Sequence, residues 1–335
     1  MSGQRGAAGK VAGDWDTYWR NQRLATHCAP GGAHDDVLRR FWSRLFDEVF
    51  SRASAAVNVL DIGCGNGAVA RLALASARSR NPNAELGIFG LDHSYAALAE
   101  LHRRAPRIVC IAADGAHGPF RDQAFDLITS QFGLEYAGPL ALDEAVRLLR
   151  PGGILSAALH VRNGGIYREC EINRRAVDLV RGYRLLDHFR QAFEASLGAK
   201  QRRPEDGSLR AAESRFTAAL AKTEDVLRRW GKDAATGLIF RLYTDVATMA
   251  RQRETYEPRD IFAWVEFMTR ELDNYSSRMA SMLAAALSAE QFDHAVARLQ
   301  ERGLGIRLRS LLGVGPQSVP VAWIVVAVKT ASSPL

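Results

Sequence analysis

The sequence predicts an α/β protein with a mostly parallel sheet, a terminal antiparallel hairpin and a large all-helical insert after the fifth strand. Three observations lead to this fold class. Short apolar segments alternate with helical ones between residues 57 and 161. Helical periodicity then continues to about residue 287, and two strand-like runs around a Gly/Pro/Ser turn follow. Strands that alternate with helices indicate βαβ units and a sheet covered on both faces.

An aromatic cluster and an amphipathic helix precede the alternating pattern. Trp15, Tyr18 and Trp19 stand at helical spacing in the string DWDTYWRNQR. Residues 34–50, HDDVLRRFWSRLFDEVF, predict a helix with one apolar stripe. That stripe comprises Val37, Leu38, Phe41, Leu45, Phe46 and Val49.

Five strands and three helices are predicted in the alternating region. The strands read VNVLDI, ELGIFGLD, RIVCIAAD, AFDLITSQFGLEY and ILSAALHV. The helices read GAVARLALASARS, SYAALAELHRR and PLALDEAVRLLRPGG. We expect Ser94 to cap the second helix and Pro151-Gly152-Gly153 to stop the third.

The domain boundaries follow from these patterns. An unstructured loop as long as the segment after the fifth strand would be unusual, so its helical periodicity predicts a second small domain or lid. SAEQ, from Ser288 to Gln291, is a capping box for a further helix before the final hairpin. We expect an N-terminal arm with an aromatic flap at 1–33, the core at 34–163, the helical lid at 164–287, and a helix and hairpin that complete the core at 288–331.

Composition narrows the class of protein. The formal net charge of +7 favours an anionic partner without establishing one. The four cysteines lie far apart and form no C-x-x-C pair, so neither a metal site nor a disulfide framework is expected. The N-terminus has no apolar region typical of a signal peptide, and the apolar run at 319–328 is too short to cross a bilayer. We therefore expect a cytoplasmic protein with no membrane partner.

The string GCGNGA, from Gly63 to Ala68, forms a glycine-rich turn between a strand and a helix. It formally fits the dinucleotide fingerprint G-x-G-x-x-G/A. Asp61, two residues before Gly63, would face a pyrophosphate of like charge, which is unfavourable. S-adenosylmethionine carries a sulfonium and an ammonium and is the better match. Asp92 ends the second strand, where an acid binds a ribose in either cofactor.

Five strings in this order, VLDIGCGNG, GLDHS, AADG, FDLITSQFGLEY and LLRPGG, occupy residues 57–160. Here the chain resembles the class I S-adenosylmethionine-dependent methyltransferases, and the hairpin near residues 305–329 resembles the family's sixth and seventh strands. The resemblance implies a seven-stranded Rossmann-like sheet whose last strand is antiparallel. The helical insert lies outside the common core and is similar to the family's variable substrate-covering segments.

The resemblance also implies which residues bind the cofactor. Asp61 and the loop would line its methionine end, Asp92 would hold the ribose, and His93 would flank the adenosine. Asp114 and Gly115 would lie by the adenine, and Gln131 by the methionyl end. The string WDTYW resembles the aromatic flap over the cofactor. The implied cofactor-binding residues are Asp61, Gly63, Cys64, Gly65, Gly67, Asp92, His93, Asp114, Gly115, Gln131, Trp15 and Tyr18.

Methyl transfer from a sulfonium is an SN2 displacement, in which the enzyme aligns the acceptor and excludes water. A base is needed only if the acceptor arrives protonated. Substrate-facing groups are expected at the carboxyl ends of strands. The catalytic candidates are Glu135 and Tyr136 after strand four and His160 near the end of strand five. A hydrogen-bonded structural role for His160, and a solvated or helix-capping role for Glu135, are the alternatives.

The sequence does not identify the methyl acceptor. SQFG stands where an N-P-P-Y-type string would follow strand four, which argues against methylation of adenine or glutamine amino groups. Four arginines recur at near-helical spacing in the insert. They form either a solvated helix face or a binding surface for an acidic substrate or carrier: Arg174, Arg175, Arg181 and Arg184.

We therefore expect a methyltransferase that acts on oxygen or nitrogen of a small-molecule or peptide-like acceptor. The insert is expected to serve as its lid and could also form a homodimer surface. The alternatives are an RNA or other nucleic-acid methyltransferase, which only the charge suggests, and a non-catalytic cofactor-binding partner or regulatory protein.

Overall fold

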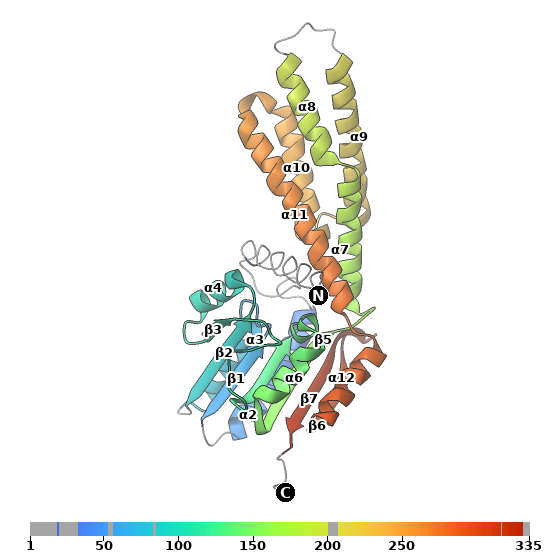
Figure 1. Ribbon diagram of the computed structural model, residues 1–335. Helices are drawn as coiled ribbons and strands as arrows, with labels where there is room; N and C mark the ends of the chain where they lie inside the picture. Colours follow the sequence, from blue (N-terminus) through green and yellow to red (C-terminus); the bar gives the residue numbers. More distant parts are fainter. Residues whose placement is uncertain are drawn as a thin grey trace. The chain divides into compact units, whose positions relative to one another are not determined.

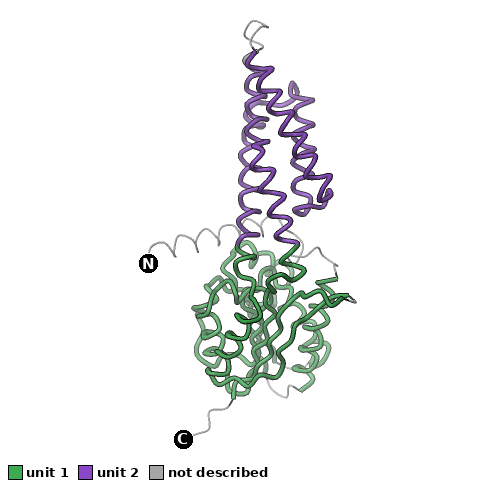
Figure 2. Tube along the Cα trace, turned by 90° about the vertical axis from the view of Figure 1, so that its right-hand side faces the viewer, with its two compact units in different colours: residues 1–168, 281–335 green, residues 169–280 purple. Residues whose placement is uncertain are grey.

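The computed structural model describes Trp19 and residues 33–52, 56–82, 85–199, 207–315 and 317–330. Trp15 and Tyr18, the expected flap residues, lie outside this part of the chain. The described residues divide into two units, one made of residues up to 168 and from 281 onward, the other of residues 169–280 (Figure 2).

A seven-stranded sheet organises the first unit, in the order β3-β2-β1-β4-β5-β7-β6 (Figure 1). Only β7 runs against its neighbours β5 and β6, and the other pairings are parallel. The predicted sheet with one antiparallel final strand is therefore confirmed. The strands are β1 (Val57–Ile62), β2 (Leu86–Asp92), β3 (Val109–Ala112), β4 (Phe125–Gln131), β5 (Leu149–His160), β6 (Leu304–Val314) and β7 (Val319–Lys329).

Helices cover both faces of this sheet. Because side chains alternate along a strand, Leu60 and Ile62 of β1 point to the face where α6 (Pro139–Leu148) and α12 (Ala289–Glu301) pack. Asp61 points to the opposite face, toward α3 (Ala68–Arg80), whose neighbour is α2 (Ala33–Arg52). Two shorter helices, α4 (Tyr95–Arg104) and α5 (Leu134–Ala137), follow β2 and β4.

The predicted helix caps are confirmed. The Ser94 hydroxyl accepts a hydrogen bond from the Ala97 amide at the start of α4. Ser288 and Gln291 form the reciprocal capping box of α12. Each cap satisfies amides that the first helical turn leaves without a partner, so local sequence fixes where these two helices begin.

Two predicted boundaries are wrong. The fourth strand ends at Gln131 rather than continuing to Tyr136, because Phe132 adopts a φ of 56° and the chain turns into α5. The helix α6 ends at Leu148, before the Pro-Gly-Gly string, because Leu149 already pairs with Phe125 of β4. The Pro-Gly-Gly string lies inside β5 instead, where the pairing of β5 with β4 shifts its register and Gly152 adopts a φ of 78°.

The helix α2 has more apolar surface than one stripe. Leu38, Leu45 and Phe46 of the predicted stripe are buried, as are Trp42 and Phe50. The other three stripe residues are only partly buried: Val37, Phe41 and Val49. The helix therefore presents one apolar face to the core and a second one that the core does not cover.

The second unit is entirely helical in the described residues. It takes in most of α7 (Gly165–Gly182) and α11 (Pro258–Ala285), together with α8 (Leu185–Ala199), α9 (Gly207–Trp230) and α10 (Leu238–Arg251). Two 3₁₀ turns, η1 (Ala234–Gly237) and η2 (Arg253–Thr255), flank α10. Its own core includes Ile239, Leu242 and Val246, which are fully buried. This hydrophobic core explains why the segment is helical rather than an unstructured connection.

Three of the four insert arginines bind carboxylates of their own unit. Arg174 and Arg181 both contact Asp178, and Arg181 also donates to Asp273. Arg184 pairs with Asp187. These contacts favour the interpretation as a solvated, ion-paired helix face. No described helix combines the length and apolar character that a transmembrane span requires.

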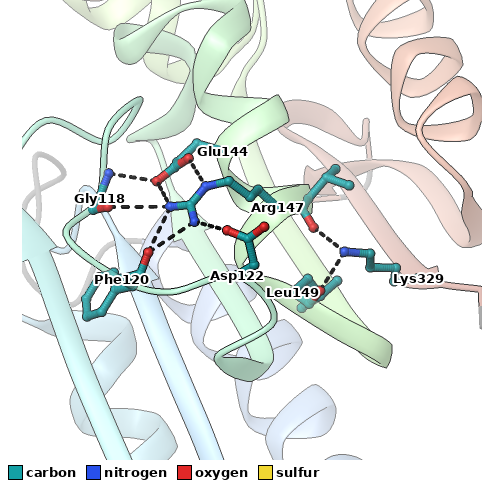
Figure 3. A network of polar contacts seen from close by, with 8 residues as sticks. Gly118, Phe120, Asp122, Glu144, Arg147, Leu149 and Lys329 are labelled. Carbon is teal, nitrogen blue, oxygen red and sulfur yellow. Dashed lines mark hydrogen bonds and ion pairs between the residues drawn. The ribbon is translucent and has the colours of Figure 1, made fainter.

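A buried acid organises the connection that precedes β4 (Figure 3). Glu144 of α6 accepts from the Gly118 amide at 2.8 Å and from the Arg147 guanidinium at 2.7 and 2.8 Å. Arg147 also donates to the Phe120 carbonyl and to Asp122. The guanidinium lowers the pKa of the Glu144 carboxyl below its ordinary range. The network therefore ties residues 118–122 to α6.

We expect Arg147→Met to lower the free energy of unfolding by about 2 kcal/mol, because it leaves a largely buried carboxylate without its cation. Urea denaturation measures this. Since pairing lowers the Glu144 pKa, the difference from wild type is present above the ordinary pKa of a glutamate and narrows as the carboxyl protonates in acid. Arg121→Met, an exposed neighbour, is the control and should change stability by less than about 0.5 kcal/mol. An equal effect of both variants would contradict the assignment.

Candidate functional site

The carboxyl ends of four parallel strands bring the predicted site residues together. Asp61, Asp92, Gln131 and His160 stand at or next to the ends of β1, β2, β4 and β5. The parallel registers of these strands place their carboxyl ends at one edge of the sheet. Residues separated by up to 99 positions in the chain therefore lie along one edge of the sheet.

The glycine loop turns sharply because three of its residues have positive φ. Gly63, Gly65 and Gly67 have φ of 65°, 53° and 80°. The amides of Gly63 and Cys64 both donate to the Leu91 carbonyl of β2. A Cβ on Gly63 would lie 2.7 Å from the Gly133 Cα. Glycine is therefore required here by both conformation and space.

Asp92 holds the loop from the side. Its side chain is almost fully buried, and its two oxygens accept from the Gly65 and Ser94 amides, each at 2.8 Å. Each carboxylate oxygen retains capacity for a second hydrogen bond. Asp92 can therefore shape the loop and still accept from a ligand hydroxyl.

The Asp61 carboxyl group is buried, and burial disfavours its charged form. It is 1% exposed, and it accepts from the Ala70 amide at 3.2 Å and from the Thr129 hydroxyl at 2.9 Å. Burial, with a smaller contribution from nearby Asp92, raises its pKa to about 7 against the effect of these two bonds. A cationic group next to Asp61 would favour the ionised form.

Asn66 is a residue of this loop that the sequence analysis missed. It is 1% exposed, and its side-chain Nδ2 has no hydrogen-bond partner among the described residues. A buried amide donor without an acceptor is costly, so this atom is suited to donate to a bound ligand. The only sequence signal was its place between Gly65 and Gly67. Cys64, by contrast, is buried, and burial raises the pKa of its thiol.

Gln131 is oriented by a residue far away in the chain. The Trp42 indole N–H donates to Gln131 Oε1 at 2.6 Å. Because an indole can only donate, the amide oxygen faces Trp42 and the amide NH₂ group faces the other way. The sequence placed Gln131 near the cofactor but gave no sign of Trp42.

His160 and Glu135 form a buried pair. Glu135 Oε1 lies 2.8 Å from His160 Nδ1 and accepts from the His160 backbone amide at 2.9 Å. Their side chains are 1% and 4% exposed, for Glu135 and His160 respectively. Phe132 stacks on the imidazole at 4.1 Å between ring centroids, and Tyr136 meets it edge-on. The carboxylate fixes the orientation of the ring.

The residues expected near the adenine are more open. Asp114 is exposed and accepts from the Ala116 amide, and Gly115 approaches the end of β1, where a Cβ would lie 3.1 Å from Ile62 Cγ2. His93 is half exposed, with its Nδ1 3.9 Å from Asp92. These three positions border the same edge of the sheet, and they are more exposed to solvent than Asp61 is.

Trp19 is the one described residue of the aromatic N-terminal string. A Cβ added to Gly65 would lie 2.7 Å from Trp19 Cζ2, so the indole ring lies directly against the glycine loop. This contact explains why position 65 has no side chain.

The residues at this edge fit S-adenosylmethionine. The buried Asp61 carboxyl favours a cation, Asn66 and Gln131 offer amide donors to a carboxylate, and Asp92 offers acceptors to hydroxyls. Among the described residues, no group of three His, Cys, Asp or Glu side chains could bind a metal. The arrangement suits binding of a cationic nucleoside next to a buried His–Glu pair.

Comparison with known proteins places this region in a family. A family model described as "Methyltransferase domain" matches residues 59–153. That range begins in β1 and ends in β5, and it contains the glycine loop, Asp92 and Gln131. The helical second unit lies outside the matched range.

Three curated relatives are similar to part of this chain. Malonyl-acyl-carrier-protein O-methyltransferase of Geobacter sulfurreducens is 33% identical over 47% of this chain and 58% of its own length. Demethylmenaquinone methyltransferase of Beutenbergia cavernae is 32% identical over 38% and 56%. A ubiquinone/menaquinone biosynthesis C-methyltransferase of Ralstonia nicotianae is 31% identical over 45% and 60%. The chain thus matches little more than half the length of these relatives.

Among solved structures, the CurJ carbon methyltransferase is similar over 90% of this chain and 56% of its own, with 14% identity and a TM-score of 0.45. The strand order, the glycine loop and the matched family model agree with one another. Residues 59–153 of the first unit thus match a methyltransferase domain, within a sheet whose strand order is that of a Rossmann-like methyltransferase.

Proposed function

We propose that this protein transfers a methyl group from S-adenosylmethionine to a small-molecule or carrier-bound acceptor. The observation that carries the proposal is the buried Asp61 carboxyl beside a glycine loop, at the sheet edge where His160 and Glu135 also lie. A binding site for a dinucleotide would place phosphates next to this acid, which is unfavourable.

The cofactor would supply an electrophilic methyl group on its sulfonium. Asp61, Asn66 and Gln131 would hold its methionine end, and Asp92 its ribose. Trp19, in contact with Gly65, would cover the loop and exclude water, which is the role expected of the aromatic flap. The chain's contribution to the rate would come largely from holding the two reactants in line.

His160 would act as a general base through Nε2, the ring nitrogen that points away from Glu135 in the hydrogen-bonded pair. Glu135 would position the ring and stabilise the imidazolium. A base serves acceptors that lose a proton, which include hydroxyls and acidic carbons. We therefore add carbon to oxygen and nitrogen as an expected acceptor atom. Relatives named as C-methyltransferases and as O-methyltransferases both match this chain.

The helical second unit would provide acceptor specificity. Its core is independent of the sheet, and the matched methyltransferase model does not include it. Segments of this kind can vary between relatives while the cofactor site stays constant. That the unit acts as a lid or forms a homodimer surface stays a prediction.

Calorimetry should detect S-adenosylmethionine binding to the full chain, and Asp92→Ala should weaken it by at least tenfold. The variant loses both the ribose acceptor and the bond that holds Gly65. Asp122→Ala, an acid remote from the loop, is the control. Tight binding of NAD without binding of S-adenosylmethionine would reverse the cofactor assignment.

The affinity for S-adenosylmethionine should fall as the pH drops through 7. Asp61 holds a proton below its raised pKa of about 7, and a bound cation requires the ionised form, so Kd should rise toward tenfold per pH unit below that value. Isothermal titration between pH 5.5 and 8.5 measures the slope. Asp61→Asn should bind weakly and flatten the profile.

An imidazole near the loop could produce a similar slope, because it gains positive charge in acid. His93→Gln is therefore the matched control and should leave the pH profile of binding unchanged. A flat profile in the wild-type protein would contradict a role for the Asp61 charge.

His160→Gln should reduce methyl transfer by about 10²- to 10⁴-fold with little change in cofactor affinity. Transfer of a labelled methyl group to an acceptor isolated from host extract measures this. Glu135→Gln should lower turnover less, because the imidazole remains but loses the carboxylate that orients it. An unchanged rate in His160→Gln would remove the base from the proposal and leave the cofactor assignment intact.

A further inference from the structure

A groove of about 770 Å³ lies in the first unit along α2. One wall is the second apolar face of this helix, and the other wall is β6. Residues of β1, β4, β5 and β7 contribute to the lining between them, among them Ile154 and Val326. None of the described cofactor-binding or catalytic candidates lines it, so the groove is separate from the site described above.

The α2 wall has a helical repeat. Val37, Phe41, Leu45 and Val49 line the groove at intervals of four residues. The twelve residue steps from Val37 to Val49 span about three turns, or about 18 Å along the helix axis. On the opposite wall, Leu308 of β6 is 40% exposed and Leu312 lies four residues further along the strand. The apolar residues of the two walls thus form a strip about as long as a short helix.

Arginines line both sides of this strip. Arg40 and Arg44 lie four residues apart on α2, and Arg52 lies eight residues after Arg44. Arg150 and Arg307 lie across from them. The lining carries only two acids. Glu48 pairs with Arg52 and Asp126 pairs with Arg150.

Three of these arginines have no counter-charge. Arg40, Arg44 and Arg307 are exposed and form no ion pair with any described residue. An apolar strip bordered by cationic rims is complementary to a ligand with an apolar face and acidic flanks. A second copy of this chain is disfavoured, because a symmetric contact would bring the same arginines together.

We propose that this groove docks an acidic amphipathic helix of a partner protein. The apolar face of that helix, three to four turns long, lies on the α2 stripe and Leu308. Its glutamates or aspartates bind Arg40 and Arg44 on one side and Arg307 on the other. This is the helix-in-groove mode of recognition, with charge selecting the partner.

The test uses the full chain and a fluorescein-labelled helical peptide of about 16 residues, long enough for four turns. The peptide carries leucines on one face and glutamates on both flanks. Fluorescence anisotropy should show saturable binding that weakens as salt rises. A peptide with lysine in place of each glutamate, and a scrambled peptide of the same composition, should bind at least tenfold more weakly.

The double variant Arg40→Glu/Arg44→Glu should weaken peptide binding at least tenfold, and Leu308→Asp should do the same from the other wall. Arg39→Glu/Arg78→Glu makes the same change in net charge at exposed arginines outside the groove and should retain binding. Thermal denaturation and S-adenosylmethionine affinity of each variant show whether fold and cofactor site are intact.

Three outcomes would overturn the proposal. The first is peptide binding that is equal in the two double variants. The second is binding to vesicles of anionic phospholipid that depends on Arg40 and Arg44 while the peptide does not bind. The third is a wild-type dimer, seen by sedimentation, that Arg40→Glu/Arg44→Glu dissociates, because a second copy would then occupy the groove.

Discussion

The hydrogen bond from the Gly65 amide to Asp92 joins the glycine loop to the second strand, and the cofactor site depends on it. Together with the bonds from the Gly63 and Cys64 amides to the Leu91 carbonyl, this bond fixes the loop against β2. The Ala70 amide bonds Asp61 on the other side, so two acids at adjacent strand ends hold the loop between them. In the proposed function, the same carboxylates that shape the backbone would also carry the charge that selects a cationic ligand.

Holding Asp61 inside the fold has an energetic cost. The folded protein binds its proton more tightly than the unfolded chain, with a pKa near 7 instead of the ordinary 3.8. This carboxyl therefore destabilises the fold as pH rises from about 4 to about 7, and the loss persists above that range. A bound cation would offset this loss. In the proposed function, the affinity for the cofactor and the stability of the domain would thus be set partly by the same residue.

Much of the sheet and the glycine loop could be predicted, because both depend on local pattern. VNVLDI predicts β1 to the residue, and Ser94 is recognised as a cap from its neighbours alone. The pairing of Glu135 with His160 depends on the register of β4 against β5, which no local signal encodes. The contact between Trp42 and Gln131 spans 89 positions and depends on how α2 packs. The break after Gln131 was missed because a positive φ at Phe132 is unusual for that residue.

The helix α2 connects two regions that the sequence gives no reason to associate. One of its faces lines the arginine-bordered groove through Phe41 and Val49, while Trp42, on the face toward the sheet, fixes the amide of Gln131. A rotation of α2 by a few degrees would change the position of the indole N–H and of the amide it orients. By thermodynamic reciprocity, any ligand of the groove that favours one rotation would change cofactor affinity, and the cofactor would change the affinity of that ligand by the same factor.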